Sequence, residues 1–138
     1  MKIFVLFLLS FLSTQVMATN LLCSGEELTV YRHKNAEPRS EKKSASLTLQ
    51  VRNSELEDFT SCQSDATFIR CNTCKFFTQK HEDCLNNQRG SGQRMKREVV
   101  LNRISGEVKS TSILDVYSQG LASTHIFSGK CEIAKPKF

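Results

Sequence analysis

Apolar and polar side chains alternate strictly in Ser46-Leu47-Thr48-Leu49-Gln50-Val51-Arg52. In an extended strand, successive side chains point to opposite faces of the sheet, so this stretch has one apolar face and one polar face. A period of two is typical of a half-buried β-strand and not of a helix. The stretch therefore predicts a sheet that packs on one side and meets solvent on the other.

The same period recurs along the chain, and clusters of Gly, Asn, Ser and Asp separate the repeats. The expected strands span residues 20–31, 45–52, 55–61, 66–71, 74–79, 97–104, 107–117 and 122–133. Short strands at turn-separated intervals predict an all-β fold, a small antiparallel sandwich or barrel of about six to eight strands.

The connections between these strands are expected to be polar loops, the longest at 32–44 and 80–96. A helix could form only at 80–88 or 112–118, and neither stretch carries a convincing capping residue. Helices therefore have little part in the expected fold.

The first eighteen residues have the layout of a secretory signal peptide. Lys2 supplies one positive charge, residues 3–12 are apolar except for Ser10, and Val16-Met17-Ala18 precedes the expected cut. The apolar run is shorter than the roughly 20 residues that span a bilayer, and no later segment is more apolar. We expect a signal peptide at 1–18, a single domain at 19–138, a secreted or periplasmic location and no membrane span.

The charge of the chain is mildly basic. The formal net charge is +5 over 138 residues, and loss of Lys2 with the signal peptide would leave +4. Basic and acidic residues are interspersed, which favours a solvated mixed surface over a nucleic-acid interface.

Six cysteines would meet an oxidising compartment after export, and sequence alone allows 15 pairings. Spacing favours one set of three. A Cys23–Cys131 bridge would link the first and last expected strands and enclose the longest loop. Cys62 and Cys71 flank a turn signal, and Cys74 with Cys84 would then close the loop that holds His81.

Zinc binding and redox catalysis are two alternative roles for the cysteines. Cys71, Cys74, His81 and Cys84 form a zinc-compatible ligand set. Export argues against free thiolates, and zinc there would leave an odd number of cysteines. Cys71 and Cys74 also have the spacing of a redox motif, but no βαβ pattern surrounds them. We expect no metal and no cofactor.

Catalytic candidates are few. His81, His125 and Lys75 could act as the acid, base and phosphate ligand of a ribonuclease-like phosphodiester hydrolase. Pancreatic-type ribonucleases have a Cys-Lys-Asn-Thr-Phe motif, whereas this chain has Cys74-Lys75-Phe76-Phe77-Thr78, without the asparagine. No Ser-His-Asp order or Gly-x-Ser-x-Gly elbow is present. The sequence leaves enzymatic activity open but favours a protein without it.

Residues 89–97 form a basic, glycine-containing segment, Arg-Gly-Ser-Gly-Gln-Arg-Met-Lys-Arg. Free amides near arginines could bind an anion. The favoured interpretation is a solvated loop that leads into a strand at Glu98.

The last forty residues or so resemble the ending of many small exported proteobacterial proteins of unknown activity. The resemblance rests on residues 101–107, on Phe127-Ser128-Gly129-Lys130-Cys131 and on the terminal Lys137-Phe138. It implies an exported β-fold whose final strand is fixed by its cysteine.

Taken together, these features favour a binding protein of the periplasm or extracellular space. Its partner would be a protein, an envelope component or a small ligand in the barrel interior. The alternatives are the phosphodiester hydrolase and an inhibitor of a secreted hydrolase, which would be another small exported β-protein.

Overall fold

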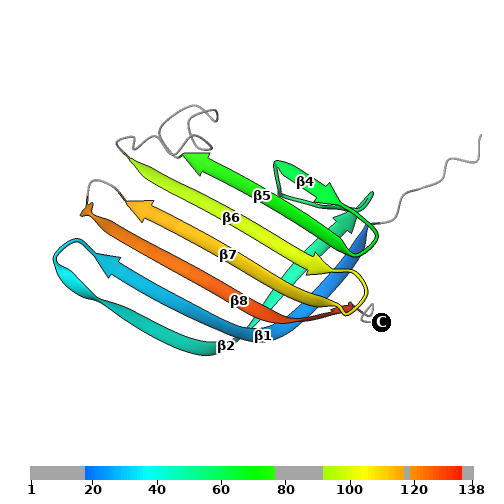
Figure 1. Ribbon diagram of the computed structural model, residues 1–138, viewed down its shortest axis with the longest axis horizontal. Helices are drawn as coiled ribbons and strands as arrows, with labels where there is room; N and C mark the ends of the chain where they lie inside the picture. The colour runs from blue at the N-terminus through cyan, green and yellow to red at the C-terminus, as the bar shows by residue number, and fades with distance from the viewer. Residues whose placement is uncertain (1–17, 77–91, 117–118, 135–138) are drawn as a thin grey trace, which may run out of the picture.

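A computed structural model describes residues 18–76, 92–116 and 119–134 of the chain. The described elements are eight β-strands (Figure 1). Their bounds are β1 Thr19–His33, β2 Ala36–Arg52, β3 Glu55–Leu56, β4 Ser61–Ser64, β5 Phe68–Phe76, β6 Gln93–Asn102, β7 Glu107–Val116 and β8 Leu121–Ile133.

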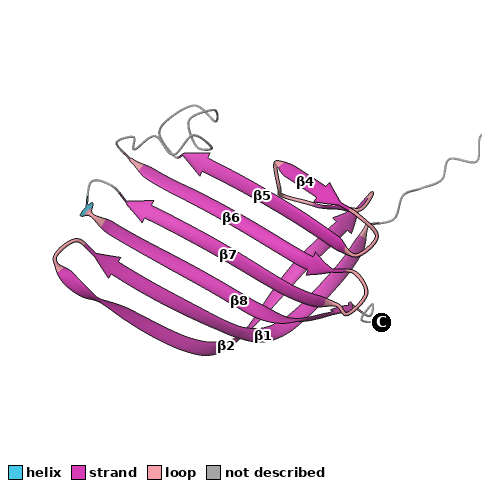
Figure 2. Cartoon of the chain, viewed as in Figure 1, coloured by secondary structure: helices cyan, strands magenta, loops and turns pink. Residues whose placement is uncertain are grey.

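All neighbouring strands are antiparallel and belong to one sheet of order β3-β2-β1-β8-β7-β6-β5-β4 (Figure 2). The first and last long strands, β1 and β8, therefore pair in the middle of the sheet. The short edge strand β3 contacts β4 and β5, so the sheet curls until its two edges meet. The result is a nearly closed barrel, which confirms the predicted all-β class.

The apolar face of each strand points into the barrel, as the alternation predicts. Residues of odd number face inward in β1, β2, β5, β6 and β8, and residues of even number do so in β7, because the register pairs them across the sheet. The buried core is made of Cys23, Leu49, Leu56, Ile69, Cys71, Val99, Leu101, Val108 and Phe127.

Two predicted disulfides are confirmed. Cys23 on β1 bonds its cross-strand partner Cys131 on β8, and Cys62 bonds Cys71 across the β4–β5 hairpin. Cys74 is also disulfide-bonded, whereas Cys84, its expected partner, lies outside the described residues. These bonds are consistent with an oxidising, extracellular or periplasmic setting.

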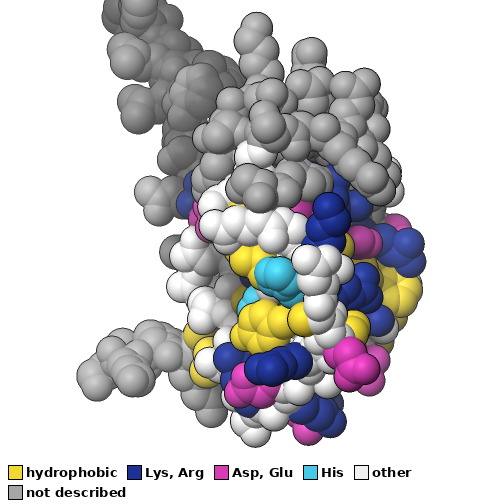
Figure 3. Space-filling view, turned by 90° about the vertical axis from the view of Figure 1, so that its left-hand side faces the viewer, with side chains coloured by type: hydrophobic (Ala, Val, Ile, Leu, Met, Phe, Trp, Pro, Cys, Tyr) yellow, Lys and Arg dark blue, Asp and Glu magenta, His cyan; other side chains and the backbone are white. Residues whose placement is uncertain are grey.

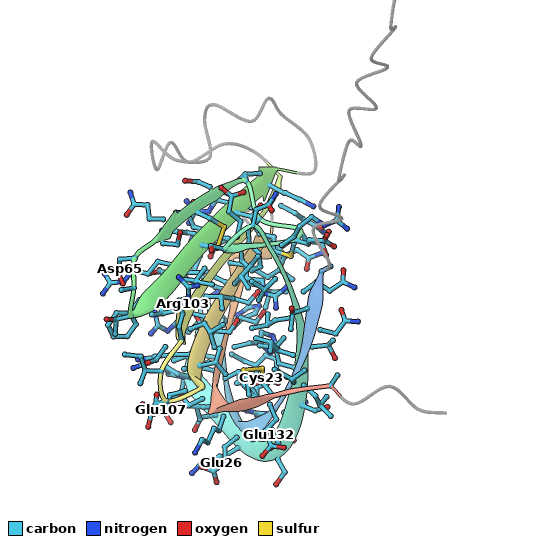
Figure 4. All side chains as sticks on the ribbon, turned by 90° about the vertical axis from the view of Figure 1, so that its right-hand side faces the viewer. Cys23, Glu26, Asp65, Arg103, Glu107 and Glu132 are labelled. Atoms are coloured by element: carbon cyan, nitrogen blue, oxygen red, sulfur yellow. A yellow bond between two sulfur atoms is a disulfide. The ribbon has the colours of Figure 1, made fainter. Side chains whose placement is uncertain are left out.

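The turns at one end of the barrel are tied to each other (Figure 4). Asp65 Oδ1 accepts backbone hydrogen bonds from Thr67 and Phe68, both at 2.7 Å, which lower the pKa of its carboxyl and fix the β4–β5 turn. Arg103, in the β6–β7 turn, donates to the Asp65 carbonyl oxygen at 2.9 Å. This hydrogen bond links the β4–β5 and β6–β7 turns.

The prediction of a loop at 32–44 is wrong, because β2 begins at Ala36. Its polar first half pairs with β1, with Tyr31 opposite Arg39, and Lys42 Nζ lies 2.7 Å from Glu26 Oε2. Main-chain pairing with a neighbouring strand holds these residues in a strand even though none of residues 36–44 is buried.

Other boundaries also differ from the prediction. The strand expected at 55–61 is only β3, since Asn53, Ser54 and Asp58 have positive φ and make turns. In the described residues, the strands expected at 66–71 and 74–79 form one strand, β5. Its partner β4 was not among the expected strands, although the hairpin that joins Cys62 to Cys71 was predicted. Residues 93–96 belong to β6 rather than to a loop, and 112–116 belong to β7 rather than to a helix.

The possible helix at 80–88 and the first part of the loop expected at 80–96, up to residue 91, lie outside the described residues. Over the described ranges, no helix has both the length and the hydropathy needed to cross a membrane.

Candidate functional site

A row of polar residues crosses the inner face of the barrel. Thr29 on β1 lies opposite His125 on β8, His125 opposite Ser112 on β7, Ser112 opposite Arg97 on β6, and Arg97 opposite Thr73 on β5. We call Thr29, His125, Ser112, Arg97 and Thr73 the interior polar row. An inward-facing polar residue is unusual, because burying a polar group is unfavourable unless it finds a partner.

A cavity of about 400 Å³ lies against this row, and we call it the inner cavity. Its wall mixes apolar side chains from the adjoining core with polar side chains from and next to the row. The lining includes Leu47, Met95 and Phe127 on the apolar side and Glu27, Arg97, Ser110, Ser112 and His125 on the polar side.

Glu27 is the acidic group of the inner cavity, and its carboxylate already has partners. Its Oε1 lies 3.3 Å from Thr29 Oγ1, 3.4 Å from His125 Nδ1 and 3.4 Å from Lys43 Nζ. Burial raises the pKa of the Glu27 carboxyl, but these three contacts together lower it by more than burial raises it. The pKa therefore lies below its ordinary value. Glu27 is therefore ionised and locally compensated.

Arg97 is the basic group of the inner cavity, and it lacks such compensation. Its guanidinium carbon lies 5.2 Å from the centre of the Phe59 ring. Burial lowers the pKa of Arg97, and the nearby charge of Asp58 partly offsets this. No carboxylate among the described residues lies within ion-pair distance of Arg97.

Arg94, on the same strand, shows what a compensated arginine looks like. Its Nη2 lies 2.6 Å from Asp115 Oδ2 on the neighbouring strand β7. Arg97 lies three residues further along β6, on the opposite face. Its cross-strand partner on β7 is Ser112, which carries no charge. Within the described ranges, Arg97 therefore differs from Arg94 in having no acceptor for its guanidinium N–H groups.

Two hydroxyl groups beside Arg97 are also buried. Thr73 is 4% exposed and Ser110 is 6% exposed. Thr73 Oγ1 has no hydrogen-bond partner among the described residues. Buried polar atoms are nearly always paired in folded proteins, so an unpaired hydroxyl next to an uncompensated guanidinium needs an explanation.

A second pocket, of about 440 Å³, lies further along the same strands, and we call it the mouth pocket. It is lined by Tyr31, Leu114, Val116, Leu121 and Ala122, with His33, Arg32 and Arg39 among the remaining lining residues. Leu114 and Ser123 directly follow Ser112 and His125 in the inward alternation of β7 and β8. Figure 3 looks onto this end, where histidine and hydrophobic side chains lie together with lysines and arginines around them.

The opposite end has a different character. Figure 4 shows Glu26, Glu107 and Glu132 near the lower rim of that view, with the Cys23 disulfide inside the barrel. Glu26 is engaged by Lys42, and Ser105 Oγ donates to Glu107 Oε2 at 3.2 Å. A third pocket, of about 530 Å³, lies at this end against the β6–β7 turn, but the interior polar row does not line it.

The catalytic residues predicted from sequence are only partly brought together. His125 belongs to the interior polar row, whereas Lys75 lies on β5 as an exposed residue opposite Met95, and strands β6 and β7 separate it from β8. His81 lies outside the described residues. The described part of the chain therefore does not assemble the hydrolase site.

The zinc-compatible set also fails on the described residues. Cys71 is bonded to Cys62, and Cys74 is in a disulfide, so neither can supply a thiolate. The redox pairing of Cys71 with Cys74 is excluded for the same reason. His81 and Cys84 lie outside the described residues.

Sequence reasoning missed Arg97, Thr73, Ser112 and Thr29 as site residues, although a signal was present. In β6, Arg97 shares its parity with Val99 and Leu101, so the alternation places it on the inner face. The basic segment 89–97 drew attention to charge, but the favoured interpretation placed it in solvent. Polar residues at strand positions that the alternation assigns to the inner face are the signal that identifies these site residues.

Comparison with known proteins adds no relative. No protein-family model, curated protein sequence or solved structure matches the chain.

Proposed function

We propose that this protein is an exported binding protein that holds one small ligand inside its barrel. The observation that carries the proposal is the inner cavity of about 400 Å³, which is bounded by both polar and apolar inward side chains. Eight-stranded barrels either fill their interior with side chains or hold one small ligand there. A volume of roughly 300–1,000 Å³ is usual for small-molecule sites.

The composition of the wall supports ligand binding over simple loose packing. A few convergent polar groups in an otherwise apolar pocket fix the orientation of a ligand. Here Arg97, Ser112 and His125 converge from three adjacent strands on a cavity that Leu47 and Phe127 also line. Strands hold such groups more rigidly than loops do, because each strand is hydrogen-bonded on both sides.

Titration with a fluorescent apolar probe tests the proposal. The secreted, disulfide-bonded protein is titrated with N-phenyl-1-naphthylamine, whose emission rises in apolar surroundings. We expect saturable binding of one probe per chain. The variant Ser112→Trp fills the inner cavity and should weaken binding at least about tenfold, as expected when a bulky side chain occupies the ligand's volume.

The matched control is Thr111→Trp, the adjacent residue on the same strand, which faces outward. It should bind the probe within about twofold of wild type. Thermal unfolding of each variant reports whether the barrel is intact. The proposal is wrong if the folded wild-type protein shows no saturable binding, or if both tryptophan variants weaken binding equally.

A further inference from the structure

We infer that the ligand is an amphiphile with a single anionic group, bound with that group against Arg97 and with its apolar part directed toward the mouth pocket. The inference rests on the proposed function and specifies its ligand class. It depends on the charge, hydroxyl groups and apolar wall around the inner cavity.

The first step is the charge of Arg97. Its guanidinium offers five N–H donors in a planar fork that suits a carboxylate or sulfonate. In the described residues these donors make no hydrogen bond, and the side chain rests on the Phe59 ring at 5.2 Å. An anion in the inner cavity would supply the missing acceptor and restore the favourable energy of the charged form lost by burial.

The second step is the pair of hydroxyls that flank Arg97 in register. Ser112 on β7 and Thr73 on β5 are its two cross-strand neighbours on the inner face. Thr73 Oγ1 is buried and has no partner among the described residues. Hydroxyls beside a guanidinium can donate to the same anion, and such charge-assisted bonds are the stronger kind.

The third step concerns the acids that could oppose an anion. Glu27 lines the inner cavity, but Lys43, His125 and Thr29 already surround its carboxylate. Asp58 attracts Arg97 from beyond ion-pair distance. Glu27 is compensated and Asp58 is distant, so neither acid accepts a hydrogen bond from Arg97 in the described residues. The inner cavity therefore favours an anionic ligand over a cationic one.

The fourth step sets the orientation. Beyond the interior polar row, the next inward residues toward the open end include Leu114 on β7 and Tyr31 on β1. They line the mouth pocket with Val116 and Leu121, and Leu121 is 38% exposed. Burial of this apolar surface by the ligand's hydrocarbon part would add to the binding energy.

A pair of probes that differ by one charge tests the inference. N-Phenyl-1-naphthylamine is neutral, and 8-anilinonaphthalene-1-sulfonate is the same ring system with a sulfonate. Dissociation constants of both are measured for wild type, Arg97→Gln and Arg97→Lys. We expect Arg97→Gln to weaken the sulfonate about tenfold, the loss of one charge-assisted hydrogen bond, and to leave the neutral probe within about twofold. Arg97→Lys should retain part of the preference.

Arg70→Gln is the matched control. Arg70 also lies over a phenylalanine ring, 5.6 Å from the centre of Phe68, but it is exposed on the outer face of β5. Its loss removes the same net charge from the protein without touching the inner cavity. Both probes should bind this variant as they bind wild type.

Two further variants keep the test decisive if Arg97→Gln folds poorly. Thr73→Val removes the unpaired hydroxyl at nearly constant size and should weaken the sulfonate more than the neutral probe. Asp58→Asn removes the acid that competes for Arg97 and should strengthen the sulfonate selectively.

The outcomes separate the two proposals. If neither probe binds saturably to the folded wild-type protein, the binding function itself is wrong. If both probes bind and Ser112→Trp blocks them, but every Arg97, Thr73 and Asp58 variant changes both probes equally, the function stands and the anionic ligand is wrong. A selective loss of sulfonate binding in the Arg97 and Thr73 variants, a selective gain in Asp58→Asn and no change in Arg70→Gln support the inference.

Discussion

At the scale of single residues, the interior of this barrel is unusual for its charged groups. Glu27 and Arg97 both face inward, yet only Glu27 has its charge compensated by neighbours within 3.5 Å. Burying an ion is unfavourable unless it is paired and hydrogen-bonded. In the proposed function, Glu27 stabilises the fold and Arg97 binds the anionic group of the ligand.

The role of Glu27 has a pH signature. Its pKa in the folded protein lies below the ordinary value of 4.5 because its contacts with His125, Lys43 and Thr29 outweigh the effect of burial. A carboxyl with a lowered folded-state pKa contributes stability that is complete above the unfolded-state pKa and is lost as the pH falls through the folded-state pKa. Wild type should therefore lose more stability than Glu27→Gln between about pH 5 and pH 3.

Urea unfolding at a series of pH values measures this difference. Glu26→Gln is the control, since Glu26 is exposed and faces outward on the same strand. Parallel curves for wild type and Glu27→Gln would show that the carboxylate contributes nothing to the fold.

At the scale of elements, the β1–β8 pair is the corner around which the sheet bends. Gly25 on β1 lies opposite Gly129 on β8, two residues from the Cys23–Cys131 bridge. A Cβ added to Gly25 would overlap the backbone oxygen of Ser128, and one added to Gly129 would overlap that of Ser24. The two glycines let the backbones of β1 and β8 approach closely at this point of the sheet.

Substitution at this corner should be costly. We expect Gly25→Ala to lower the free energy of unfolding by about 1–3 kcal/mol, because the methyl group meets backbone that cannot move aside. Ser24→Ala, an exposed neighbour on the same strand, should change it by less than about 0.5 kcal/mol. Denaturant titration compares the two, and equal values would mean that β1 and β8 can separate at this point without strain.

At the scale of the whole molecule, the two described disulfides do different work. Cys23–Cys131 joins residues 108 positions apart, whereas Cys62–Cys71 joins residues 9 positions apart within one hairpin. In the chain-entropy model, a cross-link stabilises by restricting the unfolded chain, and the effect grows with the loop it closes. The first bridge therefore restricts the unfolded chain more than the second and should stabilise the fold more.

Removing each bridge separately tests this difference. Replacing Cys23 and Cys131 with alanine should cost about 4.7 kcal/mol, and replacing Cys62 and Cys71 should cost about 3 kcal/mol or less. Calorimetry of the two double variants gives the order, and each serves as the control for the other. A larger loss for the hairpin bridge would contradict the chain-entropy argument.

Several elements could be predicted from sequence because their signal is local. The alternation at 107–117 and 122–133 predicted β7 and β8 to within a residue at each end, and the turn at Ser64-Asp65 predicted the Cys62–Cys71 hairpin. The first half of β2 could not be predicted, because residues 36–44 have no apolar face and owe their strand to pairing with β1. The same holds for Arg97, whose neighbours come from β5 and β7.

The sequence by itself determined the fold class, because side-chain alternation is a property of the chain alone. Cysteine spacing favoured the two described disulfides over the other pairings but did not fix them. Only the tertiary structure decided which polar residues meet. Thr29, Thr73, Arg97, Ser112 and His125 come from five strands, and the register that sets them in one row depends on hydrogen bonds between segments up to 96 residues apart. A one-residue shift in any pairing would turn those side chains to the opposite face.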